Sequence, residues 1–248
     1  MTEDGFLGGR LKILQPEKGY RAGIDAVFLA ASIPCKPGEP VFEAGIGTGV
    51  AALCLVERVP SVHVTGIELA SRYAYLAEEN ARRNNLDRSI RIIHGDVKDA
   101  LRRDLAHMPE QGSFAHAYAN PPYFEHDKAT PSPAALKATA HTFAPEDLEI
   151  WVKVLLAMII PGGTVTFIHR AESLGQLLAA MEGRFGDIRV APLHPREGAA
   201  ASRIIVQGVK GSKSPMQLLR GLVLHGTNAK FTAEAEAILR NGLAWQLR

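Results

Sequence analysis

Four consecutive residues, Asn120, Pro121, Pro122 and Tyr123, combine one polar amide with two rigid residues and a flat ring. Residues 113–119 before them are mostly apolar, as in a buried strand, and the strand must end here because proline has no N–H to donate. Asn120 then presents an acceptor and a donor from a stiff backbone, with Tyr123 beside it. This set suits a planar group that bears an NH2, such as adenine. A proline-rich turn is the alternative for these four residues alone.

Three glycines, Gly45, Gly47 and Gly49, stand between an expected strand and an expected helix. Glycine there permits a tight turn and lets a ligand approach the backbone at a helix N-terminus. The dinucleotide fingerprint G-x-G-x-x-G/A would need Gly or Ala at the position of Val50, and no P-loop lysine follows. The loop therefore predicts a bound ligand but weighs against NAD.

Two carboxylates follow the next two expected strands. Glu68 can accept hydrogen bonds from both hydroxyls of a ribose, and Asp96 can accept one from an adenine amino group while Val97 covers a ring face. Either acid alone could simply cap the helix that follows it. Together with the glycine loop and Asn120, they fall on the carboxyl edge, where open α/β sheets bind ligands.

Positioning these residues requires a repeating alternation of strands and helices. We expect helices at 24–33, 50–59, 70–84, 97–105, 145–159 and 174–181, and strands at 41–44, 62–67, 90–94, 114–119, 164–169, 188–193 and 202–209. The alternation predicts a parallel sheet with helices on both faces. Residues 194–201 leave no room for a crossover helix, so the last two strands must be antiparallel. The predicted fold is α/β, a seven-stranded, mostly parallel sheet with a reversed last strand.

The flanks differ from this regular region. Residues 1–21 are polar and glycine-rich, and predict an irregular N-terminal arm with a strand near 11–14. We expect residues 22–209 to form the main domain. We expect residues 210–248 to form a short basic extension packed on it, with a strand at 218–224 and a helix at 232–239 that Thr232 caps. Six basic residues stand against two acidic ones in the extension.

Composition sets broad limits. A chain of 248 residues, 46% hydrophobic and 22% charged, fits one large soluble α/β domain. Cys35 and Cys54 are too few for a disulfide framework or a zinc site, and no histidine has a second ligand at metal-binding spacing. With neither a signal-peptide pattern nor an apolar run of membrane-spanning length, we expect a cytoplasmic protein without a metal and away from the membrane.

The order of these motifs resembles the class I S-adenosylmethionine-dependent methyltransferases, whose fold has a seven-stranded sheet with a reversed last strand. Asn-Pro-Pro-Tyr matches the subgroup that methylates exocyclic or amide nitrogens. The chain is also similar to bacterial tRNA adenine-N6 methyltransferases that act beside the anticodon of a valine tRNA. The segments that carry this likeness are residues 15–21, residues 23–26, Trp151, residues 194–198, residues 221–225, Phe231 and Thr232.

The resemblance implies S-adenosylmethionine as cofactor and a role for each matching residue. Gly45, Gly47 and Gly49 would line its methionine portion, and Glu43 would lie near its amino group. Glu68 would bind its ribose, and Asp96 and Val97 its adenine. Gly23 and Asp25 would close over its amino-acid end, and Asn120 would also contact the cofactor. Asn120, helped by the Pro121 carbonyl, would accept hydrogen bonds from the target NH2 while Tyr123 stacks on the base. Pro122 completes the motif, and residues 124–143 would form a lid.

The predicted function is N6-methylation of an adenine in RNA, and specifically of an adenine next to the anticodon of a tRNA. One alternative is a glutamine-amide methyltransferase of proteins, but that family carries a helical domain before the glycine loop. Another RNA or DNA amino-methyltransferase is a further alternative, although no insertion could hold a DNA target-recognition domain. A nicotinamide-dependent oxidoreductase fails at Val50 and leaves Asn120 unexplained. A non-catalytic RNA-binding module would not need Glu68 and Asp96 together. Both a monomer and a homodimer remain open.

Overall fold

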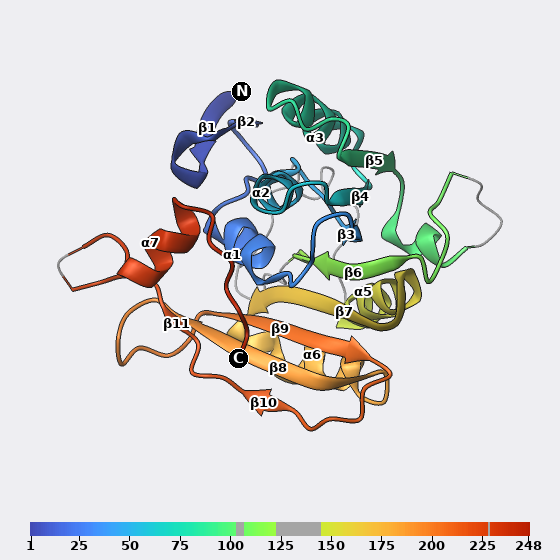
Figure 1. The fold of residues 1–248 in the computed structure, drawn as a ribbon, viewed down its shortest axis with the longest axis vertical. Helices are drawn as coiled ribbons and strands as arrows, with labels where there is room; N and C mark the ends of the chain where they lie inside the picture. Colours follow the sequence, from blue (N-terminus) through green and yellow to red (C-terminus); the bar gives the residue numbers. More distant parts are fainter. Residues whose placement is uncertain (103–106, 123–144, 228) are drawn as a thin grey trace, which may run out of the picture.

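The computed structural model describes residues 1–102, 107–122, 145–227 and 229–248. In this part of the chain, nine strands form one sheet in the order β10-β8-β9-β7-β6-β3-β4-β5, with β11 also paired to β8 (Figure 1). The strands are β3 (Pro40–Ala44), β4 (His63–Glu68), β5 (Ile90–His94), β6 (Phe114–Ala119), β7 (Ile159–Arg170), β8 (Phe185–His194), β9 (Arg203–Lys210), β10 (Gln217–Leu218) and β11 (Leu222–Val223).

Seven of these strands make up the predicted sheet. The strands from β3 to β7 pair in parallel, whereas β9 runs antiparallel to both β7 and β8. The mostly parallel fold with its reversed strand is therefore confirmed. The structure adds β10 and β11, which replace the single strand predicted at 218–224. Gly221 separates them at φ +76°, in close contact with the Pro192 carbonyl, so the backbone cannot continue as one strand there.

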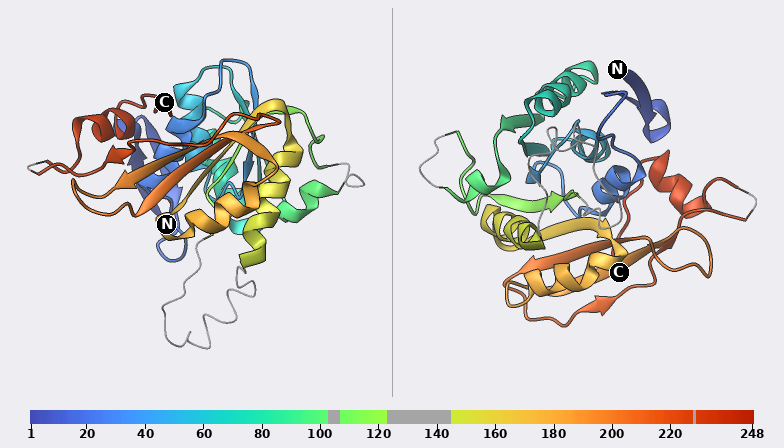
Figure 2. Two further views of the ribbon diagram at one scale, coloured as in Figure 1. Left: turned by 90° about the horizontal axis from the view of Figure 1, so that it is seen from below. Right: turned by 180° about the vertical axis from the view of Figure 1, so that it is seen from behind.

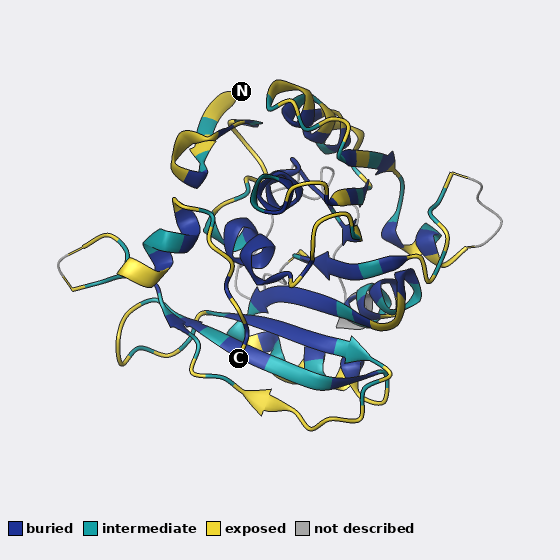
Figure 3. Cartoon of the chain, viewed as in Figure 1, coloured by how far each residue is buried: buried dark blue, intermediate teal, exposed yellow. Residues whose placement is uncertain are grey.

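Helices cover both faces of the sheet, as predicted (Figures 2 and 3). One apolar core joins the sheet to α1, α2, α3 and α7, and a second core joins its other face to α5 and α6. The helices are α1 (Ile24–Ser32), α2 (Val50–Arg58), α3 (Ser71–Arg83), α5 (Pro145–Met158), α6 (Leu174–Met181) and α7 (Ala233–Leu239). In α3, Ala74, Ala77 and Ala81 are buried at helical spacing, so one stripe of the helix faces the core.

Shorter helical elements complete the frame. They are the 3-10 turns η1 (Leu7–Gly9), η2 (Val97–Leu101) and η3 (Ala171–Ser173). η2 is shorter than the helix predicted at 97–105, and residues 103–105 of that prediction lie outside the described residues. The predicted cap of α7 is confirmed, because Thr232 Oγ1 accepts a hydrogen bond from the Ala235 N–H at 3.2 Å. None of the helices in the described part of the chain has the length and hydropathy of a membrane span.

The N-terminal arm is more regular than predicted. β1 (Thr2–Phe6) and β2 (Leu11–Gln15) pair as an antiparallel hairpin, of which only β2 was expected. β1 is polar and contains Gly5, so it lacks the apolar alternation by which a strand is predicted. The pairing is therefore decided by β2, whose Leu11 and Ile13 are buried in the core.

Asn80 of α3 and Asn84, the C-cap residue of that helix, pair with β2 as a neighbouring strand would. Asn80 Oδ1 accepts from the Leu14 N–H at 2.7 Å, and its Nδ2 donates to the Leu14 and Thr48 carbonyls at 3.0 and 2.9 Å. Asn84 makes the same pair of bonds with Lys12 at 3.0 and 2.9 Å. Because Thr48 lies in the glycine loop, Asn80 connects the hairpin to that loop.

Replacing Asn80 with alanine should destabilise the protein, because the Leu14 N–H and two carbonyls would lose a buried partner. A buried polar group left unsatisfied costs about 1–3 kcal/mol, so we expect the free energy of unfolding to fall by at least about 2 kcal/mol. Asn84→Ala is the matched control, since its two hydrogen bonds with Lys12 are exposed and water can replace them. Urea titrations of both variants measure the free energy of unfolding. Equal decreases in the two variants would show that the buried hydrogen bonds of Asn80 add no stability.

Candidate active site

The predicted target-binding strand lies beside the glycine-loop strand. Ala44, the last residue of β3, is the register partner of Ala119, the last residue of β6. Gly45 and Asn120 therefore leave the sheet next to each other. Asn120 is half-buried, Pro121 is buried and Pro122 is exposed. β6 ends where the two prolines require it to end.

Two predicted elements of this region cannot be placed. Tyr123 lies outside the described residues. The lid predicted at residues 124–143 lies outside them as well.

The glycine loop has a backbone that only glycine adopts easily. Gly45, Gly47 and Gly49 have φ values of +68°, +57° and +84°. A Cβ on Gly45 would lie 2.6 Å from the Trp151 ring, and one on Gly47 would lie 3.1 Å from the Tyr20 ring. Two aromatic rings thus contact the loop backbone directly.

Glu68, at the end of β4, is fixed to the glycine loop. Its Oε2 accepts a hydrogen bond from the Gly47 N–H and its Oε1 accepts one from the Ala70 N–H, both at 2.9 Å. The carboxylate is only partly buried, so further donors can reach it. Both oxygens are therefore held in position at the mouth of the loop.

Asp96 and Val97 follow β5 on the same edge of the sheet, since Glu68 is the register partner of His94. Asp96 Oδ1 accepts from the Lys98 N–H at 2.9 Å and caps η2, which is the capping role that such an acid can have without a ligand. Val97 is buried, at 7% exposure. Among the described residues, no group of three or more His, Cys, Asp or Glu side chains could hold a metal ion.

Glu43 is the most enclosed carboxyl group near the loop. It is 4% exposed, and its Oε2 accepts a hydrogen bond from the Tyr118 hydroxyl at 2.8 Å. Burial raises the pKa of Glu43 well above its ordinary value, and the negative charge of Glu68 adds to the rise. Burial and the same Glu43 raise the pKa of Tyr118, so this phenol keeps its proton.

Gly23 and Asp25 stand at the start of α1, where they were expected to close over the ligand. Gly23 is the N-cap residue and Asp25 lies in the first turn, where the helix dipole favours a negative charge. Asp25 Oδ2 accepts a charged hydrogen bond from Arg203 Nε at 2.9 Å. Arg203 begins β9, so the reversed strand fixes the acid of α1.

Tyr20 reaches into the same region from the segment before α1. Its ring packs edge-on against Tyr73 at 6.0 Å, and its N–H donates to the Tyr73 hydroxyl at 3.0 Å. The residue is 49% exposed as a whole. Burial of its hydroxyl, followed by the negative charges of Glu43, Asp25 and Glu68, raises the pKa of Tyr20 to about 12. Three acids therefore act electrostatically on one hydroxyl beside the glycine loop.

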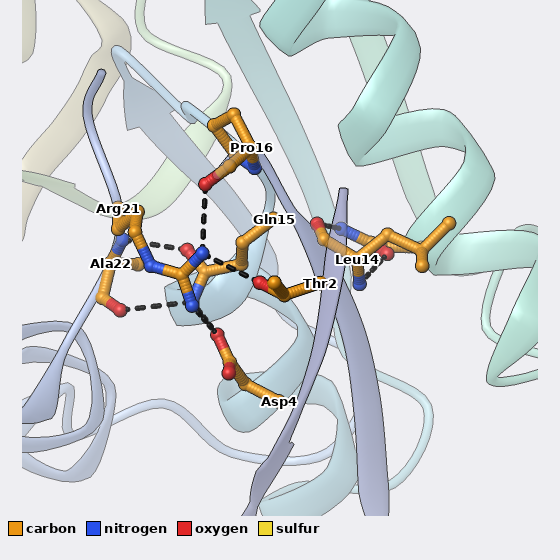
Figure 4. Close-up of polar contacts among 8 residues, drawn as sticks. Thr2, Asp4, Leu14, Gln15, Pro16, Arg21 and Ala22 are labelled. Carbon is orange, nitrogen blue, oxygen red and sulfur yellow. Dashed lines mark hydrogen bonds and ion pairs between the residues drawn. The ribbon is translucent and has the colours of Figure 1, made fainter. Parts of the chain in front are cut away.

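A polar network holds the segment that carries Tyr20 (Figure 4). Arg21 donates to the Thr2 hydroxyl at 2.6 Å, to the Pro16 carbonyl at 2.7 Å and to Asp4. Gln15, buried at 1% exposure, accepts from the Ala22 N–H at 2.8 Å and donates to Asp4 at 2.7 Å. The N-terminal hairpin thus fixes the segment between β2 and α1.

Comparison with known proteins shows which kind of domain this part of the chain resembles. Residues 41–146 match the family model described as a methyltransferase domain. Residues 41–146 are thus similar to a methyltransferase domain. This match confirms the predicted enzyme class and, with it, S-adenosylmethionine as the cofactor. The domain fits that cofactor, because its loop has no room for a Cβ at Gly45 and three carboxylates, those of Glu43, Asp25 and Glu68, act on the Tyr20 hydroxyl beside the loop.

Two relatives of this chain are named tRNA1(Val) (adenine(37)-N6)-methyltransferases. The one from Glaesserella parasuis serovar 5 (strain SH0165) is 27% identical over 64% of this chain and 63% of its own length. The one from Enterobacter sp. (strain 638) is 27% identical over 84% and 89%. A solved structure titled a predicted O-methyltransferase, protein Atu636 from Agrobacterium tumefaciens, is 26% identical with a TM-score of 0.73, covering 90% of this chain and 98% of that one.

Proposed function

We propose that the chain methylates the exocyclic N6 of an adenine in RNA, and specifically of an adenine next to the anticodon of a tRNA. The observation that supports this is the register of β3 and β6, which sets Asn120 beside the glycine loop. An amide there can accept a hydrogen bond from an NH2 group held against the methyl donor. The names of the two relatives support a tRNA substrate. A tRNA substrate would also place the protein in the cytoplasm.

The proposed chemistry depends on position rather than on a strong base. The target nitrogen is a weak nucleophile because its lone pair is delocalised into the ring. Asn120 and the Pro121 carbonyl would accept from its two N–H groups, which concentrates charge on nitrogen and aligns it, while Tyr123 stacks on the base. When bound, S-adenosylmethionine supplies an electrophilic methyl group. Alignment of this kind contributes up to about 7–11 kcal/mol in ideal cases.

The substrate class is tested by methyl transfer from tritiated S-adenosylmethionine to tRNA, rRNA, DNA and protein in parallel. We expect label in tRNA, recovered as N6-methyladenosine after nuclease digestion. Label in protein, at a glutamine amide, would replace this proposal with the amide-methyltransferase alternative. Label in DNA would replace it with a DNA amino-methyltransferase.

The basic residues of the flanks contribute unequally to any RNA surface. In the arm, Arg10 pairs with Glu57 and Arg21 with Asp4. In the extension, Lys210 Nζ donates to the Leu156 and Ile159 carbonyls beside the end of α5, and Arg220 pairs with Glu234. Charge counted along the sequence therefore overstates the positive surface. Lys230 is exposed on the loop that β11 carries to the carboxyl edge of the sheet.

The salt dependence of tRNA affinity tests which part of the surface contacts the RNA. Affinity for tRNA should fall as salt rises, and Lys230→Ala should make the slope of log K against log salt shallower by about 0.7–0.9, the value for one phosphate contact. Lys213→Ala is the matched control, because Lys213 is equally exposed but follows Ser212, which contacts Gly186 near the start of β8 at the opposite edge. Equal effects of the two variants would contradict RNA binding at the edge of the sheet that carries the site.

A further inference from the structure

Two neighbouring loops leave the carboxyl edge of the sheet beside β8. One follows β8, and the other follows β11, which pairs with the end of β8; both lie on the left in Figure 1. Each is closed by the same kind of bond, in which a histidine Nδ1–H donates to the carbonyl five positions later: His194 to Ala199 at 2.9 Å, and His225 to Lys230 at 2.5 Å. The His225 N–H also donates to the Pro195 carbonyl at 3.0 Å, so the two loops form one braced surface.

The second loop carries a stacked pair of rings with a cation beside it. The centroids of the His225 and Phe231 rings are 5.2 Å apart, with 23° between the ring planes. Lys230 Nζ lies 5.5 Å from the centroid of the Phe231 ring, and Lys230 is exposed. His225 is half-buried, and its hydrogen bond with Lys230 is solvent-exposed. A partly exposed flat ring next to a cation suits a nucleobase and its phosphate.

Arg196 adds a second cation, from the first loop. Its backbone lies alongside His225, because the carbonyl of the preceding residue, Pro195, accepts the His225 N–H. Arg196 is exposed, whereas Arg220, before the start of β11, is paired with Glu234 at 3.2 Å. Each of the two loops therefore places one exposed cation next to His225, where both can contact the phosphates of a bound nucleic acid.

The ring pair lies on the same edge of the sheet as Asn120 but at a distance from it. Arg203 of β9 is the register partner of both Arg170 on β7 and Leu193 on β8, so β7 and β8 end at nearly the same level. From β6 to β11 the sheet runs through β7, β9 and β8. Four steps between neighbouring strands, at about 4.8 Å each, separate β11 from β6 by about 19 Å along the sheet. A base stacked on His225 is therefore a different base from the one that Asn120 would hold.

We propose that His225, Phe231, Lys230 and Arg196 form a second RNA site, which stacks a base other than the target and binds its phosphates. The inference rests on the proposed function and adds where the RNA is held away from the reacting nitrogen. The His225 ring stacks on the base, Phe231 supports that ring, and the two cations contact phosphate. Every base has a flat face, so this site accepts any base and leaves the choice of target to the site at Asn120. It contributes affinity and takes no part in methyl transfer.

Binding of fluorescently labelled bulk tRNA, measured by anisotropy at about pH 8, tests the second site. His225→Ala should weaken binding by at least about fivefold, the lower end for loss of one stacked base. Its single-turnover rate at saturating tRNA should stay within about twofold of the parent, because the ring touches no reacting atom. His225→Phe should retain most of the affinity, since it keeps a flat ring and loses only the bond to Lys230. Arg196→Ala should make the slope of log K against log salt shallower by about 0.7–0.9, whereas His225→Ala should leave that slope unchanged.

His63→Ala is the matched control, since His63 is exposed at the start of β4, on the opposite edge of the sheet, and it should bind as the parent does. Parent-like affinity in His225→Ala would overturn the second site and leave the proposed function intact. Equal losses in His225→Ala and His225→Phe would overturn the stacking, because both variants lack the loop-closing bond and only one lacks the ring. A parent that binds bulk tRNA but transfers no methyl group to it would overturn the proposed function instead, and one that binds none would overturn both. Circular dichroism separates each loss of binding from misfolding.

Discussion

Asn120→Ala should lower the single-turnover rate of methyl transfer to tRNA by about 100–1,000-fold, the loss typical of removing one preorganised hydrogen-bonding group from an active site. The reason is that the target nitrogen would lose the acceptor that aligns it and raises its electron density. Asn120 follows the end of β6, whereas most of the residues expected to hold the cofactor stand at the ends of β3, β4 and β5. Binding of S-adenosylmethionine should therefore stay within about threefold of the parent.

Rapid-quench measurement with saturating cofactor and tRNA gives the rate, and calorimetry gives the affinity. Asn241→Ala is the control, because Asn241 is exposed beyond α7 and, among the described residues, only its backbone N–H is hydrogen-bonded. A rate for Asn120→Ala within about threefold of the parent would refute the positioning role, since such a role lowers the rate rather than the affinity.

Gly45→Ala should reduce the affinity for S-adenosylmethionine by at least about tenfold. A non-glycine residue at φ +68° costs roughly 1–2 kcal/mol, and the new Cβ would also lie 2.6 Å from the Trp151 ring. The loop must shift to relieve both, and it would carry with it the Gly47 N–H that holds Glu68.

Gly175→Ala provides the comparison for Gly45→Ala. Gly175 lies in α6 with no atom within 4 Å of an added Cβ, so alanine there should leave binding unchanged and slightly raise stability. The double variant Gly45→Ala, Trp151→Leu should recover part of the affinity, because it removes the clash and leaves the backbone strain. Binding by Gly45→Ala as tight as by the parent would show that the loop does not support the cofactor.

The strand ends of the site were predictable because each carries a local signal. The prolines after Asn120 stop β6, the glycines after Ala44 adopt positive φ, and an acid ends β4. Parallel strands place such ends on one edge whatever their order in the sheet. The reversed β9 was predictable for the same kind of reason, since too few residues precede it for a crossover helix.

Other residues of the site could not be found in this way. Tyr118 meets Glu43 across 75 positions and Arg203 meets Asp25 across 178, and both contacts depend on which strands become neighbours. Periodicity gives the faces of strands but not their order. One signal for Tyr118 was available: a phenol amid the alanines of an otherwise buried strand needs a hydrogen-bond partner. Tyr20 gave no such signal, because it lies in a polar segment.

The contacts that anchor α1 bear on when this helix is fixed during synthesis of the chain. Asp25 is held by Arg203, and near the C-terminus the Trp245 N–H donates to the Ala31 carbonyl at 2.8 Å while its ring packs edge-on against Phe28. Contacts between such distant positions form late, since closing a long stretch of chain costs entropy. A nascent chain on the ribosome that already carries the glycine loop, Glu68 and Asn120 still lacks the groups that anchor α1. The anchoring of α1 therefore waits until Arg203 and Trp245 have been translated.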